Sequence, residues 1–211
     1  MMHDEYIENL AFTLYSDDLP YHNFGHIRTV MRKGDEIVVR CKRDRVAIRE
    51  DIVYYALLYH DAGYHENHAA KGYPSKEAYS ADLAVEQLTG NGLDKETLGR
   101  IQAAILCTHV DAHCATNEDK AVRAADLAEL AADYRIFKKN TLDLKKELEL
   151  QTGSTISWNS WKRMAVEKIE EFLREDLHLT SDYYDEKGDS VFHKSARNNL
   201  RIMLEDDSDT L

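Results

Sequence analysis

One segment of this chain is apolar on almost every side and ends in a His-Asp pair. It starts near Asp51, runs through Tyr59, and reaches His60 and Asp61 just before Gly63. A helix that is apolar all round is typically buried in the centre of a fold, and a glycine is well suited to end it. A carboxylate beside such a helix is costly unless a cation or a hydrogen-bonding partner compensates it. The segment therefore predicts a central helix with a polar site at its end.

The rest of the chain also has helical periodicity, and the alternation typical of strands is nearly absent. The two prolines, Pro20 and Pro74, fall where helices should break, and Ser75 has the character of an N-cap. Further helices are expected over residues 3–16, 23–40, 75–88, 94–109, 121–132, 134–150 and 157–177. The tail from Ser181 is polar and acidic. We expect an all-α fold in which residues 1–211 form a single domain.

Composition limits the partners and the cellular compartment. The formal net charge is −12, from 39 acidic and 27 basic residues, which disfavours nucleic-acid polymers and anionic membranes as partners. No apolar run is long enough for a membrane span, and the first residues are too polar for a secretory signal. The three cysteines, Cys41, Cys107 and Cys114, form no regular framework and are expected to be free. These features predict a cytoplasmic protein and leave a small phosphorylated substrate open.

Four spaced pieces of sequence together indicate a metal site. They are His26, the His60-Asp61 pair, His109 and Asp126, each inside or at the end of an apolar, helix-like segment. Imidazole nitrogen and carboxylate oxygen suit a divalent ion of borderline or hard character. A His-Asp dipeptide alone could equally be a capping pair, but the combination on several helices is harder to explain by chance. The pattern predicts a helical metallohydrolase.

These residues carry a resemblance to a known family. In their order and surroundings, His26, His60-Asp61 and Asp126 resemble the HD-domain superfamily of metal-dependent phosphohydrolases, in particular its subgroup of small predicted metal-dependent hydrolases. The matching elements are residues 21–27, 59–64, 77–81, 108–109 and 126–128. The motif-bearing part covers about 6–147, and a helical extension of about 155–211 lies outside it. The subgroup usually has Asp after the tyrosine at Tyr64, whereas this chain has His65.

The resemblance implies an HD-domain-like helical bundle. Its metal ligands would be His26, His60, Asp61 and Asp126, which would hold a divalent Mn, Mg, Co, Zn or Fe ion. Such an ion polarises a phosphoryl oxygen and lowers the pKa of a bound water. The expected enzyme is a phosphomonoesterase or nucleotidase in which metal-activated water releases phosphate from a small metabolite or nucleotide.

Further roles follow for residues near these motifs. Glu77 is a candidate for proton transfer or for orienting water, with an ordinary first-turn glutamate as the alternative. His109 could contact phosphate, protonate the leaving group or help to bind a second metal, and we count it with Asp61 and Glu77 as catalytic. Candidate substrate-binding residues that could hold phosphate oxygens, or could be solvated surface charges, are Lys71, Lys76 and Arg123.

Several alternatives stay open. His22 could support the site or be a ligand itself. An extra ligand from His65, His68 or His109 would favour a two-metal hydrolase of cyclic or polyphosphorylated nucleotides. A third class is a non-catalytic HD scaffold that binds a nucleotide or a protein. A zinc cluster of Cys107, His109, His113 and Cys114 is disfavoured by its spacing. The C-terminal third could complete the core, cover the site or form the face of a homodimer.

Overall fold

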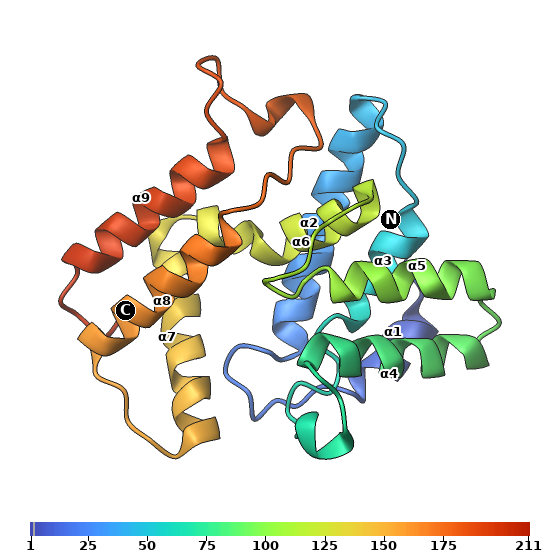
Figure 1. Ribbon diagram of the computed structural model, residues 1–211, viewed down its shortest axis with the longest axis horizontal. Helices are drawn as coiled ribbons and strands as arrows, with labels where there is room; N and C mark the ends of the chain where they lie inside the picture. The colour runs from blue at the N-terminus through green and yellow to red at the C-terminus, as the bar shows by residue number, and fades with distance from the viewer. Residues whose placement is uncertain (2) are drawn as a thin grey trace. The chain divides into compact units, whose positions relative to one another are not determined.

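The computed structural model describes residues 1 and 3–211, and over these residues the chain is built from helices (Figure 1). Nine α-helices and three short 3₁₀ helices account for the regular structure in this range, and the pairing of Tyr184 with Ser190 is an isolated bridge rather than a strand. The all-α prediction is therefore confirmed. Two compact units can be distinguished, one of Met1–Asp126 with Leu177–Thr180 and one of Leu127–Asp176 with Ser181–Leu211.

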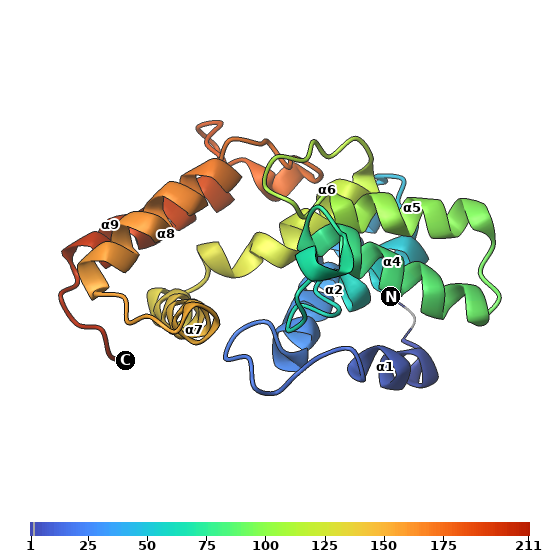
Figure 2. The ribbon, with the colours of Figure 1, turned by 60° about the horizontal axis from the view of Figure 1, so that its bottom comes forward.

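The first unit is arranged around the helix that was predicted to be central. Its helices are α1 Glu5–Phe12, α2 Phe24–Arg43, α3 Glu50–Tyr59, η1 Ala69–Lys71, α4 Lys76–Gly90, α5 Lys95–Leu106 and α6 Asn117–Asp126. Helix α3 contacts α1, α2, α4, α5 and α6, while α4 and α5 run side by side in both views (Figures 1 and 2). Because other helices surround α3, its apolar side chains pack against neighbours on nearly every face.

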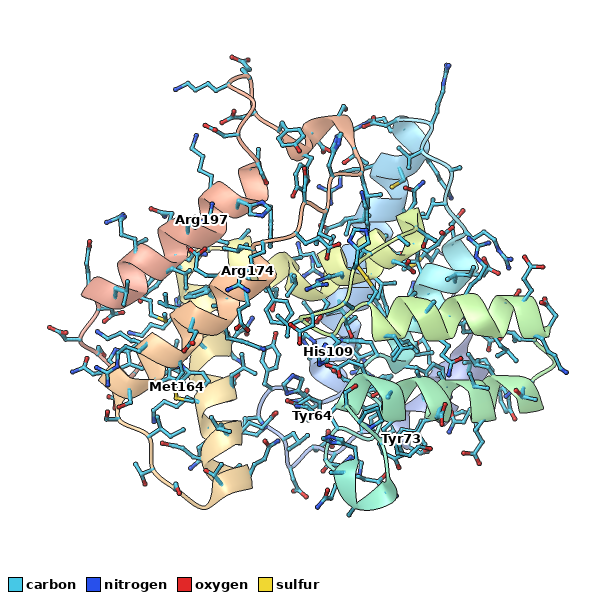
Figure 3. The ribbon with its side chains drawn as sticks, in the orientation of Figure 1. Tyr64, Tyr73, His109, Met164, Arg174 and Arg197 are labelled. Carbon is cyan, nitrogen blue, oxygen red and sulfur yellow. A yellow bond between two sulfur atoms is a disulfide. The ribbon has the colours of Figure 1, made fainter. Side chains whose placement is uncertain are left out.

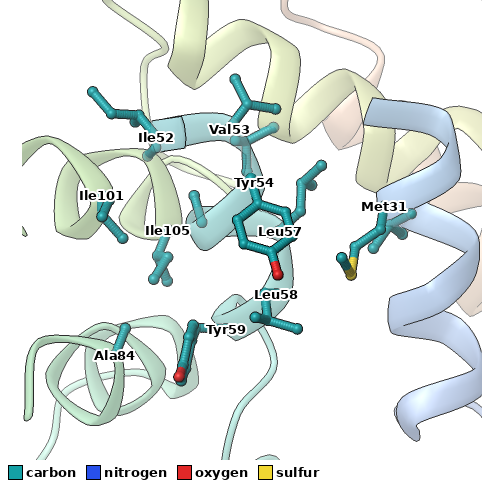
Figure 4. Packing of buried hydrophobic residues seen from close by; sticks show 14 of the residues in the cluster. Met31, Ile52, Val53, Tyr54, Leu57, Leu58, Tyr59, Ala84, Ile101 and Ile105 are labelled. Carbon is teal, nitrogen blue, oxygen red and sulfur yellow. The ribbon is translucent and has the colours of Figure 1, made fainter. Parts of the chain in front are cut away.

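Close packing around α3 supplies much of the core. Figure 4 shows Leu57 and Tyr59 among side chains of the neighbouring helices, with Met31 on α2 and Ile105 on α5. Leu57 is fully buried, which is worth about 1.5–3 kcal/mol for a side chain of this size. On α2, a Cβ at Gly34 would lie 2.3 Å from Leu57 Cδ1. The absence of a side chain there lets α2 approach α3 closely.

The helix starts were more predictable than the helix ends. Ser75 caps α4 by accepting a hydrogen bond from the Ala78 N–H at 3.2 Å, and Asp94 caps α5 through Thr97. Helix α5 ends at Leu106, so His109 lies beyond the helix on which it was expected. Capping side chains mark a helix start in the sequence, whereas this helix ends without a glycine or proline.

The prediction that Cys107 and Cys114 are free is wrong. Their sulfur atoms form a disulfide, with Cα atoms 5.7 Å apart. The chain turns at Cys107, where α5 ends, and the following loop returns Cys114 to it, a closure that sequence spacing does not reveal. Cys41 is buried and lies outside the disulfide.

The second unit has its own core. Its helices are η2 Leu127–Ala131, α7 Tyr134–Thr152, α8 Trp158–Phe172, η3 Ser181–Tyr183 and α9 Val191–Glu205. Trp158 and Trp161 pack with Phe137 and Met203 in one hydrophobic cluster. Helix α9 occupies a tail that we had described only as polar and acidic.

The boundary between the units falls at Asp126, so the motif-bearing part of about 6–147 extends into the second unit. Compactness does not measure independent folding, and the single domain over 1–211 stays a prediction. Along the described part of the chain, no helix combines the length and apolar character needed to cross a membrane.

Candidate metal centre

Three side chains from the ends of three helices meet in the first unit. His26 lies in the first turn of α2, His60 is the C-cap of α3, and Asp126 is the last residue of α6. Each offers one ligand atom, and these atoms all lie within 4.8 Å of one another. Asp126 Oδ1 is 3.4 Å from Nε2 of both histidines. This group could hold a metal ion.

Asp61 borders the same small space. Its Oδ2 atom lies 3.1 Å from His60 Nε2 and 3.6 Å from His26 Nε2. The group whose ligand atoms are all mutually close consists of His26, His60 and Asp126, so Asp61 is a neighbour that contacts two of its three members. The predicted four-ligand set is thus brought together around two imidazole nitrogens.

The two imidazole nitrogens fit a cation. Nε2 of His26 and Nε2 of His60 are buried and have no hydrogen-bond partner among the described residues, although carboxylate oxygens lie near them. The other nitrogen of His60, Nδ1, donates to the Leu57 carbonyl oxygen at 2.9 Å, which leaves a lone pair on Nε2 when the ring is neutral. Buried polar atoms without partners are rare and costly, and coordination by an ion would satisfy both.

The charged groups of the candidate site shift one another's pKa values. Burial opposes charge on His60, but Asp61 and Asp126 raise its pKa well above the usual value. Burial would likewise raise the pKa of Asp61, yet the charges of His60, His22 and His26 lower it far below the usual range. The pKa of Asp126 is also lowered, against burial, by His26 and His60. Both carboxylates are therefore ionised at neutral pH, as cation binding requires.

The turn after the His-Asp pair is fixed by packing against α4. Gly63 has φ +71°, and a Cβ there would lie 2.6 Å from Tyr79 Cε1. Its N–H donates to the Leu14 carbonyl at 2.9 Å, and Ser80 Oγ donates to the Ala62 carbonyl at 2.8 Å. The sequence element 77–81 thus supports the turn that carries Asp61.

Two candidate catalytic residues lie outside this group. Glu77 is half-buried in the first turn of α4, and His109 follows α5, with Nδ1 accepting from the Asp111 N–H at 3.2 Å. Within the described chain, no hydrogen bond or ion pair joins either residue to His26, His60 or Asp126. Their catalytic roles stay predictions.

The three candidate substrate-binding residues have different surroundings. Lys71 pairs with Glu66, with Nζ 2.6 Å from Oε2, and the Lys76 ammonium lies 3.3 Å from the centroid of the Tyr64 ring. Arg123 is buried and donates to the backbone carbonyls of Cys107, Val110 and Ala112 at 3.3, 3.0 and 2.7 Å. The alternative of a solvated surface charge is therefore wrong for Arg123, whose guanidinium supports the loop after α5.

The structure also places the other three histidines that were considered as additional ligands. The His22 ring stacks on Tyr64, and its centroid is 6.1 Å from that of His26, so His22 lies beside the ligand group rather than in it. His65 and His68 are not members of the group found among the described residues. Figure 3 labels Tyr64 and His109 on the ribbon of the first unit. The stacking of Tyr64 on His22 was not predicted from the sequence, where the position of Tyr64 directly after Gly63 was the available signal.

A separate cavity does not coincide with this chemistry. It has a volume of about 830 Å³ and is lined by the start of α1, by His3 and Asp4 just before it, and by Glu50, Asp51, Tyr54 and Tyr55 of α3. None of its lining residues is a candidate ligand. The candidate site is therefore defined by the geometry of its possible ligand atoms.

The chain matches no protein-family model and no curated protein sequence. Any functional assignment consequently depends on the residues themselves.

Proposed function

We propose that this chain is an HD-type metal-dependent phosphohydrolase, of the phosphomonoesterase or nucleotidase kind. The observation that carries the proposal is the pair of buried, unpartnered Nε2 atoms of His26 and His60 beside the Asp126 carboxylate. Chance capping pairs would not leave two such atoms facing one carboxylate. The order of the His, His-Asp and Asp motifs adds support through its resemblance to the HD superfamily.

Each residue has a definable task in this proposal. His26, His60, Asp61 and Asp126 hold the divalent ion, and the Leu57 carbonyl fixes the orientation and tautomer of His60. When bound, the ion supplies Lewis-acid polarisation of a phosphoryl oxygen and activation of water. Glu77 is proposed to orient the water or accept its proton, and His109 to serve the leaving group. His65 and His68 lie outside the ligand group, so we propose a site for one ion.

The substrate is proposed to be a small phosphorylated metabolite or nucleotide in the cytoplasm. A formal net charge of −12 disfavours long polyanions, whereas a bound cation can neutralise a single phosphate group locally. Phosphoryl transfer depends mainly on positioning and charge stabilisation, and a compact centre can supply these for a small molecule.

The test combines metal analysis with phosphate release. Purified protein is stripped with a chelator and reloaded with Mn²⁺, Co²⁺, Mg²⁺ or Zn²⁺, and phosphate release is measured over a panel of nucleotides and sugar phosphates. Asp126→Asn is compared with Asp143→Asn, a matched change at a carboxylate that pairs with Lys139 on α7. We expect metal-dependent release that Asp126→Asn abolishes and Asp143→Asn retains.

The other outcomes are equally informative. A folded wild type that binds metal and nucleotide but releases no phosphate would support the non-catalytic scaffold. Two equivalents of metal with activity on cyclic or polyphosphorylated nucleotides would support the two-metal alternative. A folded wild type without metal affinity would refute the proposed centre itself.

A further inference from the structure

A three-layer stack lies beside the candidate metal centre. The His22 and Tyr64 rings have centroids 3.6 Å apart and planes 13° from parallel. The Lys76 ammonium is 3.3 Å from the centroid of the same Tyr64 ring. A parallel ring at that distance covers one face completely, so the ammonium must lie over the other face. Tyr64 is thus clamped between an imidazole and a cation, an arrangement that stacking and cation–π attraction both favour.

The stack joins three segments that surround the ligands. His22 precedes α2, Tyr64 follows the His-Asp turn, and Lys76 opens α4. The Tyr64 N–H donates to the Asp61 carbonyl at 3.1 Å. The His22 ring centroid is 6.1 Å from that of His26. His22 is therefore the layer of the stack next to the ligands.

The charges of the candidate metal centre indicate what His22 could contribute beside it. The carboxylates of Asp61 and Asp126 together cancel the charge of a divalent ion, and neutral imidazole ligands add none. A phosphomonoester dianion at this centre needs further donors, because an anion removed from water must have its hydrogen bonds replaced. The imidazole of His22 carries at least one N–H in either protonation state.

We propose that His22 contacts the substrate, donating an N–H to a phosphoryl oxygen of a small phosphomonoester, and that Tyr64 is the positioning residue that fixes the His22 ring. This inference rests on the proposed function, because it assigns roles within the same site. Lys76 acts through Tyr64 by holding the far face of its ring. The predicted substrate-binding lysine thereby gains an indirect role.

The experiment measures binding of inorganic phosphate to the full-length, Mn²⁺-loaded protein by calorimetry, and then KM and kcat. The variants are His22→Ala, Tyr64→Leu, Tyr64→Phe and the double variant His22→Ala with Tyr64→Leu. His3→Ala is the matched control, since it removes a half-exposed imidazole from α1's start, outside the centre. Mn²⁺ affinity and thermal stability are measured for every variant.

We expect His22→Ala to weaken phosphate binding about 10- to 100-fold, as for loss of a hydrogen bond to a charged group, and to raise KM similarly. Mn²⁺ affinity should be unchanged. Tyr64→Leu should also weaken phosphate binding, but not further when His22 is already alanine, because residues that act as one unit are not additive. Tyr64→Phe keeps the stack and should bind phosphate like the wild type.

The assignment of His22 is overturned if His22→Ala binds phosphate as tightly as His3→Ala does, or if the wild type binds none. Additive effects of Tyr64→Leu and His22→Ala would reduce Tyr64 to a general structural residue. If Tyr64→Leu does not fold, Lys76→Met removes the clamp and is tested in the same two backgrounds. If the wild type binds phosphate through His22 but catalyses no phosphate release, the proposed hydrolase activity is refuted and this inference is not. If His22→Ala catalyses phosphate release with an unchanged KM, this inference is refuted and the hydrolase activity is not.

Discussion

The imidazole of His60 is central to the proposed metal centre, because its two nitrogens would have opposite tasks. Nδ1 donates to Leu57 O, so Nε2 is the nitrogen left for an ion. Without an ion, the neighbouring carboxylates instead favour a proton on the ring, against the effect of burial, and raise the His60 pKa well above 6.5. A proton and the proposed metal ion would therefore compete for one nitrogen.

This competition predicts a pH dependence of opposite sign in the two forms. A histidine with a raised pKa contributes stability that is fully present below about pH 6.5 and is lost as pH rises through the raised value. The ion-free protein should lose this contribution above pH 6.5, whereas metal binding becomes stronger as the proton leaves. We expect the increase in Tm caused by Mn²⁺ to be larger at pH 8.5 than at pH 6.

Thermal unfolding in EDTA and in Mn²⁺ over this pH range checks the prediction. Asp61→Asn removes one of the carboxylates that raise the His60 pKa, so it should weaken the pH dependence. An Mn²⁺ effect on Tm that is equal at both pH values would contradict the competition.

For individual residues, the sequence was informative about the candidate ligands and uninformative about the surroundings of the basic side chains. His26, His60 and Asp126 could be recognised because each interrupts an apolar helical pattern and all belong to a familiar order of motifs. The environments of Lys71 and Arg123 could not be recognised, because a basic side chain has the same local pattern whether it pairs with Glu66 or supports buried carbonyls. Only the tertiary fold distinguishes these cases.

The loop after α5 is held by both covalent and hydrogen-bond contacts. The Cys107–Cys114 disulfide closes it, and Arg123 on α6 donates to three of its carbonyls. Arg123 lies one turn before Asp126, so the same helix supports the loop and supplies a candidate ligand. The loop carries His109, and the disulfide and the Arg123 hydrogen bonds fix the loop around this residue beyond the end of α5.

The disulfide makes a direct prediction about thiol reactivity. Of the three cysteines, Cys107 and Cys114 form the disulfide and Cys41 keeps its thiol, so denatured but unreduced protein should contain one reactive thiol per chain. Replacing Cys107 and Cys114 by serine should lower stability by about 2 kcal/mol, from the entropy of closing a short loop, as measured by urea unfolding. Three reactive thiols before reduction would contradict the bond. Because disulfides persist mainly in oxidising compartments, the count also bears on the cytoplasmic prediction.

In the second unit, Asp206 connects α7, α8 and α9. Its carboxylate accepts from Tyr134 Oη and Lys138 Nζ, each at 2.8 Å, while its carbonyl accepts from Trp158 Nε1 at 2.7 Å. Lys138, Tyr134 and the Ser208 N–H lower the Asp206 pKa to about 2. One residue at the end of α9 thus contacts both other long helices.

We expect Asp206→Asn to cost about 1.5–3 kcal/mol at pH 7, because hydrogen bonds to a charged group are lost. A carboxylate with a lowered pKa contributes stability that is present above its unfolded-state pKa near 3.8 and is lost as pH falls through about 2. The difference between wild type and variant should therefore shrink between pH 4 and pH 2. Urea unfolding followed by tryptophan fluorescence measures it, with the exposed Asp209→Asn as control. A difference that is constant over this pH range would exclude the ion pair as its cause.

Helix α9 also shows why an element can be missed. Its buried residues Ala196, Leu200 and Met203 are spaced as on one helical face, but acidic and turn-forming residues surround them in sequence. Helix α9 was not predicted, because its apolar stripe is short and the tail as a whole is acidic. By contrast, α3 was predictable because its apolar character extends over the whole helix.

For the molecule as a whole, the central question is whether the two compact units fold together. Their hydrophobic clusters share no residue among those described, and all four candidate ligands belong to the first unit. Both tryptophans of the chain, Trp158 and Trp161, lie in the core of the second unit. Tryptophan fluorescence therefore follows one unit, whereas circular dichroism follows the helices of both.

Because the two units have separate hydrophobic cores, we expect them to unfold separately, and metal binding can reveal this. A ligand stabilises the unit that binds it, by about 2.7 kcal/mol at a free concentration of 100 times Kd. With Mn²⁺ at that concentration, the unfolding transition seen by circular dichroism should gain a component at higher urea, while the fluorescence transition stays unchanged. EDTA, or Asp61→Asn, should remove the shift. If both signals move together, the units form one cooperative domain over residues 1–211, as the sequence predicted, and metal bound at the ends of α2, α3 and α6 stabilises the whole chain.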